Sequence, residues 1–163
     1  MAATETKPTP RIAVLGVGNS YNGDDGLGAA VIARLSQSDL PESVTLVADE
    51  TAGMHLVKYF RECDLVYFVD AIAVGAKPGS VFRFKPEDAG IHELRSNNIH
   101  GMGLSYLLTN ARLLSADPEV VVYGVQYGSV MPNGGVLTPE AEEAAGFVAD
   151  RIMAELRERA ART

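Results

Sequence analysis

The chain of 163 residues contains no tryptophan and only one cysteine, Cys63. With a single cysteine, no disulfide can form within the chain. A single cysteine favours a cytoplasmic location, and its acidic neighbours indicate a structural thiol rather than a nucleophile. No apolar run approaches the roughly 18 residues that cross a bilayer. The first residues also lack the apolar segment of a secretory signal. We therefore expect a disordered leader over residues 1–10 and one domain over residues 11–163.

Positive charge is also scarce, because 14 lysines and arginines face 21 aspartates and glutamates, for a formal net charge of −7. Nucleic acids and anionic lipid surfaces both select proteins with basic surfaces. We therefore expect neither a nucleic acid nor a membrane among the partners of this chain.

Strand and helix signals alternate through the rest of the sequence. Apolar, β-branched runs predict strands at residues 11–18, 43–48, 65–71, 80–84 and 119–126. Helical spacing predicts helices at residues 26–37, 53–62, 103–114 and 139–160. This alternation is typical of an α/β fold in which helices cover both faces of a mostly parallel sheet. The link before the fourth strand is too short for a parallel crossover, so we expect that strand to run antiparallel at an edge.

A glycine-rich turn at residues 16–28 connects the first strand to the first helix, where α/β enzymes build their sites. Tyr21 stands where a dinucleotide fingerprint has its third glycine, and no Gly-Lys-Ser/Thr follows, which argues against a nucleotide site. Asp24 and Asp25 would also repel a pyrophosphate at the helix start. We expect one aspartate to cap the helix and the other to point into the crevice beside the strand.

Asp70 and His100 are the other candidates for chemistry. Asp70 follows five apolar residues of a predicted central strand, so its carboxylate should emerge at the same edge of the sheet as Asp25. His100 precedes a predicted helix, whose N-terminus keeps an imidazole neutral and able to bind a metal. Taken singly, Asp70 is also consistent with a loop cap and His100 with a solvated side chain. Taken together, two carboxylates and one imidazole suit a divalent transition metal with open coordination positions.

The usual nucleophile patterns are missing from the sequence. There is no Gly-x-Ser-x-Gly, no His-Glu-x-x-His and no credible Cys–His pair, and no triad surrounds Ser20, Ser105 or Ser129. If the chain cleaves a peptide bond, the remaining route is attack by water that is assisted by the carboxylates.

Four motifs follow one another along the chain: Gly16-Val17-Gly18-Asn19 with Asp24-Asp25 and Gly28, then Thr51-Ala52-Gly53, then Val69-Asp70-Ala71, and then His100-Gly101-Met102-Gly103-Leu104. Together they resemble the hydrogenase maturation endopeptidases, the processing proteases of [NiFe] hydrogenase large subunits. The chain departs from the family pattern in two places. Asp25 stands where many members have glutamate, and Tyr127 follows Gln126 where the family often has proline.

The resemblance implies a five-stranded, three-layer αβα sandwich with one antiparallel strand. It implies an aspartic-type endopeptidase that removes the C-terminal extension of a [NiFe] hydrogenase large-subunit precursor after nickel insertion. The substrate supplies the nickel, so the site can be empty or hold a surrogate divalent metal, and we expect the chain to act as a monomer. The implied metal ligands are Asp25, Asp70 and His100, of which the two aspartates are also the catalytic candidates. The residues expected to contact substrate are Asn19, Asp24, Gly101 and Gln126.

Two other readings of the same residues stay open at this point. A non-catalytic accessory domain that binds a metal or a nucleotide could use the same scaffold, because one fold hosts many activities. A general aminopeptidase-like hydrolase would cleave small unstructured peptides without a nickel-bearing partner.

Overall fold

The computed structural model describes residues 8–88 and 101–162 of the chain. The strands are β1 (Ile12–Val17), β2 (Val44–Asp49), β3 (Leu65–Ile72), β4 (Val81–Phe84) and β5 (Glu119–Gln126). The helices are α1 (Leu27–Ser36), α2 (Val57–Glu62), α4 (Gly101–Leu113) and α5 (Pro139–Ala161), and two 3₁₀ turns, η1 (Gly23–Gly26) and η2 (Met54–Leu56), precede α1 and α2.

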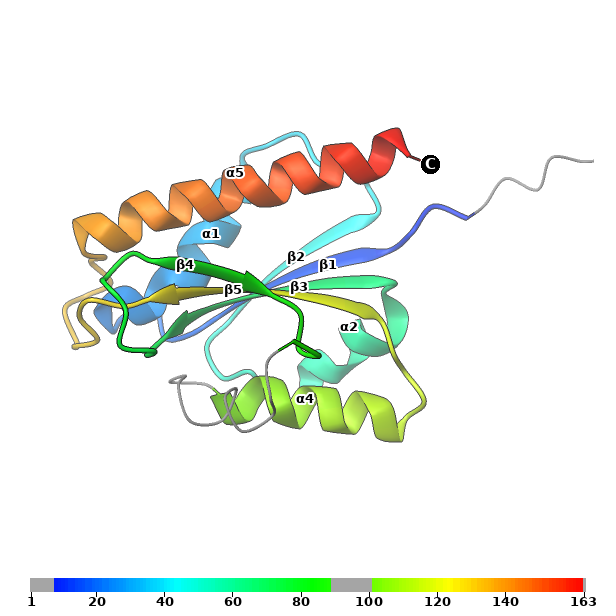
Figure 1. Cartoon of the computed structure of the whole chain (residues 1–163), viewed down its shortest axis with the longest axis horizontal. Coiled ribbons are helices and arrows are strands. Elements are labelled where there is room, and N and C mark those ends of the chain that lie inside the picture. The colour runs from blue at the N-terminus through cyan, green and yellow to red at the C-terminus, as the bar shows by residue number, and fades with distance from the viewer. Residues whose placement is uncertain (1–7, 89–100, 163) are drawn as a thin grey trace, which may run out of the picture.

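The five strands form one sheet in the order β2-β1-β3-β5-β4. Four strands are parallel, whereas β4 pairs antiparallel with β5 and occupies an edge (Figure 1). Both features of β4 confirm the prediction from its short connection, because residues 73–80 are too few to carry the chain back across the sheet. The central strands β1 and β3 are buried along their whole length, as strands covered on both faces must be.

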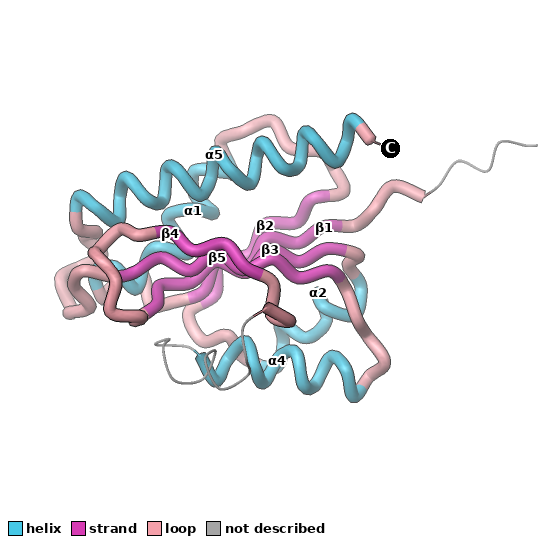
Figure 2. Tube along the Cα trace, in the orientation of Figure 1, coloured by secondary structure: helices cyan, strands magenta, loops and turns pink. Residues whose placement is uncertain are grey.

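Helices cover the sheet on both faces, with α1 and α5 on one side and α2 and α4 on the other (Figure 2). The alternation of side chains along β3 divides the core into two layers. Tyr67 and Val69 pack with α1 and α5, whereas Val66 and Phe68 pack with α2 and α4. The predicted three-layer α/β sandwich is therefore confirmed.

Close contact between β1 and α1 depends on two glycines. A Cβ atom on Gly16 would lie 2.2 Å from the carbonyl oxygen of Gly28, and one on Gly28 would lie 2.6 Å from the backbone nitrogen of Val17. Neither position accepts a side chain, so Gly16 and Gly28 serve helix–strand packing rather than a phosphate group.

The structure also corrects one helix boundary. The helix expected over residues 53–62 divides into η2 and the short helix α2. Residues 1–7 of the expected leader lie outside the described residues, so that expectation stays a prediction. Among the helices that the structure describes, none combines the length and apolar character needed to cross a bilayer.

Candidate active site

Asp25 and Asp70 lie near the carboxyl ends of the adjacent parallel strands β1 and β3. Asp25 belongs to η1, which follows β1 and lies against β3, the strand that carries Asp70. Both aspartates are buried, at 3% and 0% relative exposure. Burying a carboxylate is costly, and the edge where parallel strands end is where α/β proteins bind their ligands. Two buried acids at this edge mark it as the candidate active site.

The backbone before Asp25 is shaped to hold its carboxylate. Gly18 has a φ of +127°, and a Cβ atom there would lie 2.1 Å from the carbonyl oxygen of Asp25. This close approach allows the backbone N–H of Asn19 to donate to Oδ2 of Asp25 at 3.0 Å. The glycine of the Gly-x-Gly-Asn motif is therefore required because no other residue lets the loop fold onto Asp25.

Asp70 belongs to the layer of the sheet that faces α2 and α4. It follows Val66 and Phe68 at intervals of two residues, so the pleat directs its side chain to the face they share. Helix α4 (Gly101–Leu113) leads into the start of β5, so the N-terminal end of this helix lies at the edge where the parallel strands end (Figure 1). His100 directly precedes Gly101 in sequence but lies outside the described residues. Its role as a ligand therefore stays a prediction.

Asp24 anchors a neighbouring loop rather than the following helix. Its Oδ2 accepts hydrogen bonds from the backbone N–H of Gly128 at 2.7 Å, the backbone N–H of Ser129 at 3.1 Å and the Thr138 hydroxyl at 2.8 Å. Its Oδ1 accepts from the backbone N–H of Thr138 at 2.7 Å. The N-cap of α1 is Gly26, with no side-chain cap, so the expected aspartate cap is wrong. The intervening turn η1 directs Asp24 toward the loop before α5.

Two other residues expected to contact substrate make hydrogen bonds within the protein. The side-chain oxygen of Asn19 accepts from the backbone N–H of Tyr21 at 2.9 Å. The side-chain oxygen of Gln126 accepts from the backbone N–H of Val74 at 2.8 Å, and its Nε2 donates to the carbonyl of Tyr127 at 3.0 Å. These bonds shape the loops around the site. A direct contact of Asn19, Asp24, Gly101 or Gln126 with substrate stays a prediction.

The structure places an Asp–His pair at the end of β2 that sequence reasoning missed. Oδ1 of Asp49 accepts from the backbone N–H groups of Thr51 and Ala52, and its Oδ2 pairs with Nε2 of His55. Burial would raise the pKa of Asp49, but the hydrogen bonds from His55 and Thr51 outweigh it and lower that pKa. His55 lies in the short turn η2, which brings its ring back to the end of β2. Asp49 stands two residues before Thr51, a spacing that is typical of an Asx turn. This spacing was the signal in the sequence that could have predicted the turn.

The described residues alone do not complete a metal site. Among residues 8–88 and 101–162, no three histidine, cysteine, aspartate or glutamate side chains gather as metal ligands. Asp25 and Asp70, the two predicted oxygen donors, lie within these ranges, and their role as ligands stays a prediction. The predicted nitrogen donor, His100, is outside those ranges.

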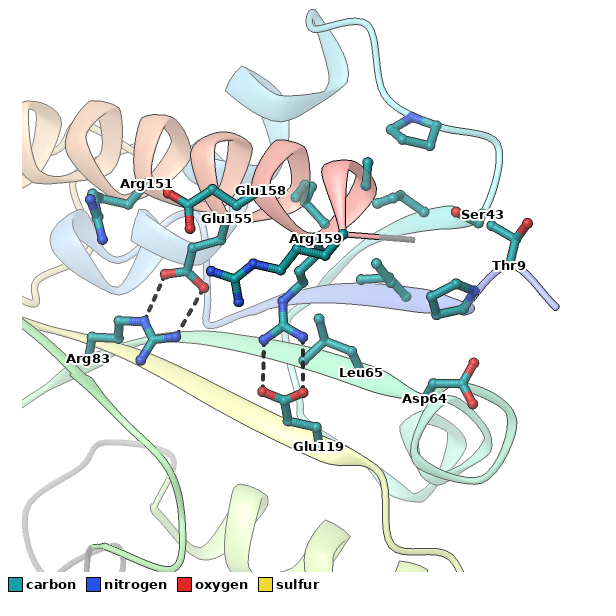
Figure 3. Close-up of a pocket in the computed structure, with 17 residues that line it drawn as sticks. Thr9, Ser43, Asp64, Leu65, Arg83, Glu119, Arg151, Glu155, Glu158 and Arg159 are labelled. Atoms are coloured by element: carbon teal, nitrogen blue, oxygen red, sulfur yellow. Dashed lines mark hydrogen bonds and ion pairs between the residues drawn. The ribbon is translucent and has the colours of Figure 1, made fainter. Parts of the chain in front are cut away.

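A cleft of about 930 Å³ lies at the opposite edge of the sheet, where β1 and β3 begin (Figure 3). Two bidentate ion pairs line it: Arg83 with Glu155, and Arg159 with Glu119. Burial would raise the pKa of Glu155, but hydrogen bonds from Arg83, Tyr123 and Tyr67 outweigh it and lower that pKa. Since these guanidinium groups pair with carboxylates of the protein itself, we interpret the cleft as a structural ion-pair network. The candidate active site lies at the other edge, with Asp25 and Asp70.

The fold is shared with solved proteases of known family. The chain superimposes on the hydrogenase maturating endopeptidase HybD from Escherichia coli with a TM-score of 0.82 and 30% identity, covering 91% of this chain and 93% of that one. It also matches the [NiFe] hydrogenase maturation protease HycI from Thermococcus kodakarensis KOD1, with a TM-score of 0.65 and 26% identity over 92% of this chain and 94% of that one. The class that fold and site define is thus an α/β peptidase.

The sequence comparisons identify the family. The profile of the hydrogenase maturation proteases (HycI) matches residues 29–155. The hydrogenase 2 maturation protease of Escherichia coli K12 is 32% identical over 153 residues, which cover 91% of this chain and 92% of that protein. The chain therefore belongs to the hydrogenase maturation protease family, whose members are endopeptidases that cleave the C-terminal extension of the [NiFe] hydrogenase large subunit. This confirms the resemblance carried by the four sequence motifs.

Proposed function

We propose that this chain recognises a [NiFe] hydrogenase large-subunit precursor by its inserted nickel, through Asp25, Asp70 and His100, and then cuts off the C-terminal extension. The observation that carries the proposal is the placement of two buried carboxylates near the carboxyl ends of the neighbouring strands β1 and β3, Asp25 in the turn η1 and Asp70 in β3. Oxygen and nitrogen donors suit a borderline divalent ion such as nickel. In this proposal the nickel belongs to the substrate and reports that the precursor is ready for cleavage.

The nucleophile in this proposal is a water molecule. Burial raises the pKa of the Cys63 thiol, which keeps it protonated and weakly nucleophilic. Ser20 donates its hydroxyl to Glu50, and no histidine among the described residues contacts it. An ionised carboxylate, by contrast, accepts the proton of an attacking water and returns it to the leaving amine. Asp25 or Asp70 performs this step once the scissile bond is held beside it.

Replacing Asp70 by asparagine tests the proposal. The asparagine side chain keeps the shape of aspartate but cannot accept a proton from water and binds a cation more weakly. We expect Asp70→Asn to retain its fold by circular dichroism and to lose at least about 100-fold in the rate of cleavage of a nickel-loaded precursor, followed by the mass of the precursor on a gel. Asp39→Asn is the matched control, since Asp39 is exposed and far from β3 in sequence. Normal cleavage by a folded Asp70→Asn enzyme would show that the site lies elsewhere.

Membership of the family indicates the partner but leaves the oligomeric state, the bound metal and the location as predictions. The family processes the hydrogenase large subunit, which makes that precursor the partner to test. A monomeric state, a surrogate divalent metal in the purified protein and a cytoplasmic location stay predictions. Sedimentation, metal analysis and cell fractionation would check them in turn.

A further inference from the structure

Three large apolar side chains stand exposed on the two loops that meet beside Asp25. Tyr21 has a relative exposure of 67%, Met131 of 66% and Val136 of 65%. We call these three residues the rim patch. Single exposed apolar residues are common on proteins, but a group of them beside an active site is typical of a surface that a partner covers.

Hydrogen bonds between the loops hold the rim patch in place. The backbone N–H of Asn133 donates to the carbonyl of Tyr21 at 3.2 Å, and the Asn133 side-chain oxygen accepts from the N–H of Gly23 at 3.1 Å and of Val136 at 3.1 Å. The carbonyl of Met131 lies close to Gly23, within 3.5 Å of a Cβ atom built there. The loop therefore has a fixed conformation that presents apolar side chains to solvent. A preformed surface costs a partner little ordering free energy.

The loop that carries most of the rim patch has no charged residue. Residues 127–138 contain no lysine, arginine, aspartate or glutamate, although 21% of the whole chain is charged. A nucleic acid, an anionic membrane or a strongly charged protein surface would have no partner charge on this loop. The chemistry of the rim patch fits an uncharged, apolar area on a folded protein.

The rim patch is also connected to the candidate active site. The backbone N–H of Tyr21 donates to the side chain of Asn19, whose own backbone N–H donates to Asp25. A protein bound on the rim patch therefore lies directly beside the carboxylate that is proposed to act on it.

We propose that the rim patch is the docking surface for the folded body of the large-subunit precursor, which it contacts through an uncharged apolar area. This inference rests on the proposed function, since it takes the same precursor as partner. Docking on the rim patch holds the precursor while its C-terminal segment enters the site at Asp25 and Asp70.

The test compares a rim-patch double variant with a matched control. Tyr21→Ser/Met131→Ser is expected to raise the KM for cleavage of nickel-loaded precursor at least about tenfold, as loss of two apolar anchors does in protein interfaces. Leu113→Ser/Leu114→Ser removes apolar side chains of 76% and 53% exposure at the far end of α4 and is expected to leave the KM within about twofold of wild type. Wild-type KM is also expected to change less than about threefold between about 0.05 M and about 0.5 M salt.

Three outcomes would overturn the inference. In the first, a folded Tyr21→Ser/Met131→Ser variant keeps a wild-type KM, or the Leu113→Ser/Leu114→Ser control raises it equally. In the second, the KM of wild type rises steeply with salt, which would indicate a charged interface. In the third, wild type sediments as a dimer that the rim-patch variant dissociates without a change in KM, which would make the patch an interface between two copies. Failure of the proposed function is distinct, since wild type would then leave the precursor intact.

Discussion

Replacing Asp24 by alanine is expected to release the loop of residues 127–138 from the rest of the molecule. The Asp24 side chain is 1% exposed and accepts four hydrogen bonds from the donors of Gly128, Ser129 and Thr138. Three of these donors are backbone N–H groups, which lose their partner when the carboxylate is removed. The donors lie 104 to 114 residues from Asp24 in sequence, so its carboxylate joins two segments that are far apart along the chain.

The magnitude follows from the number of bonds. A hydrogen bond to a charged group contributes about 1.5–3 kcal/mol, but four bonds to one carboxylate are not additive. Gly128 is exposed, so water replaces part of the loss there. We therefore expect Asp24→Ala to lower the free energy of unfolding by about 3–5 kcal/mol. Asp24→Asn should cost less, about 2 kcal/mol, because an amide oxygen still accepts from some of the same donors.

Urea denaturation of the two variants, followed by circular dichroism, measures these losses, and hydrogen exchange at Ser129 and Thr138 locates them. The control is Asp39→Ala at an exposed site, which should change stability by less than about 0.5 kcal/mol. If Asp24→Ala were as stable as that control, the loop would not depend on this carboxylate. If Asp24→Asn kept full stability but raised the KM for precursor, the residue would instead contact substrate, as the family resemblance implies.

Two further predictions concern pH and backbone strain. Ion pairs and hydrogen bonds hold the pKa values of Glu119 and Glu155 below their usual 4.5, so their stabilisation is fully present above that pH. It is lost as pH falls through the lower folded values. The free energy of unfolding should therefore drop steeply below about pH 4.5, and Glu155→Gln should make this drop smaller. If the Glu155→Gln variant kept the pH dependence of wild type, the ion-pair network would not contribute to stability as described. Gly18→Ala should lower stability by at least about 2 kcal/mol in urea melts and also reduce cleavage, because Gly18 has φ +127° and its new Cβ would meet Asp25. A fully stable Gly18→Ala variant would contradict the close approach described for that loop.

Much of the fold could be predicted because its signals are local. Apolar, β-branched runs placed all five strands to within about one residue, since a strand buried on both faces must be apolar throughout. The short link before β4 predicted its antiparallel direction from chain length alone. Asp25 and Asp70 could be selected for a similar reason. Asp25 follows one apolar strand and Asp70 lies near the end of another, and the carboxyl ends of parallel strands meet at one edge of the sheet.

The sequence by itself determined which residues form strands and helices, the family, and the two acids at the edge of the sheet, because each depends on spacing within a few positions. Tertiary structure alone decided the partners of Asp24, Asn133, His55 and Arg83. Asp24 illustrates the reason, since a helix cap and a loop anchor have the same local sequence. The fold brings Thr138 to the carboxylate of Asp24, although the two residues are 114 positions apart in sequence. No local sequence pattern predicts this contact.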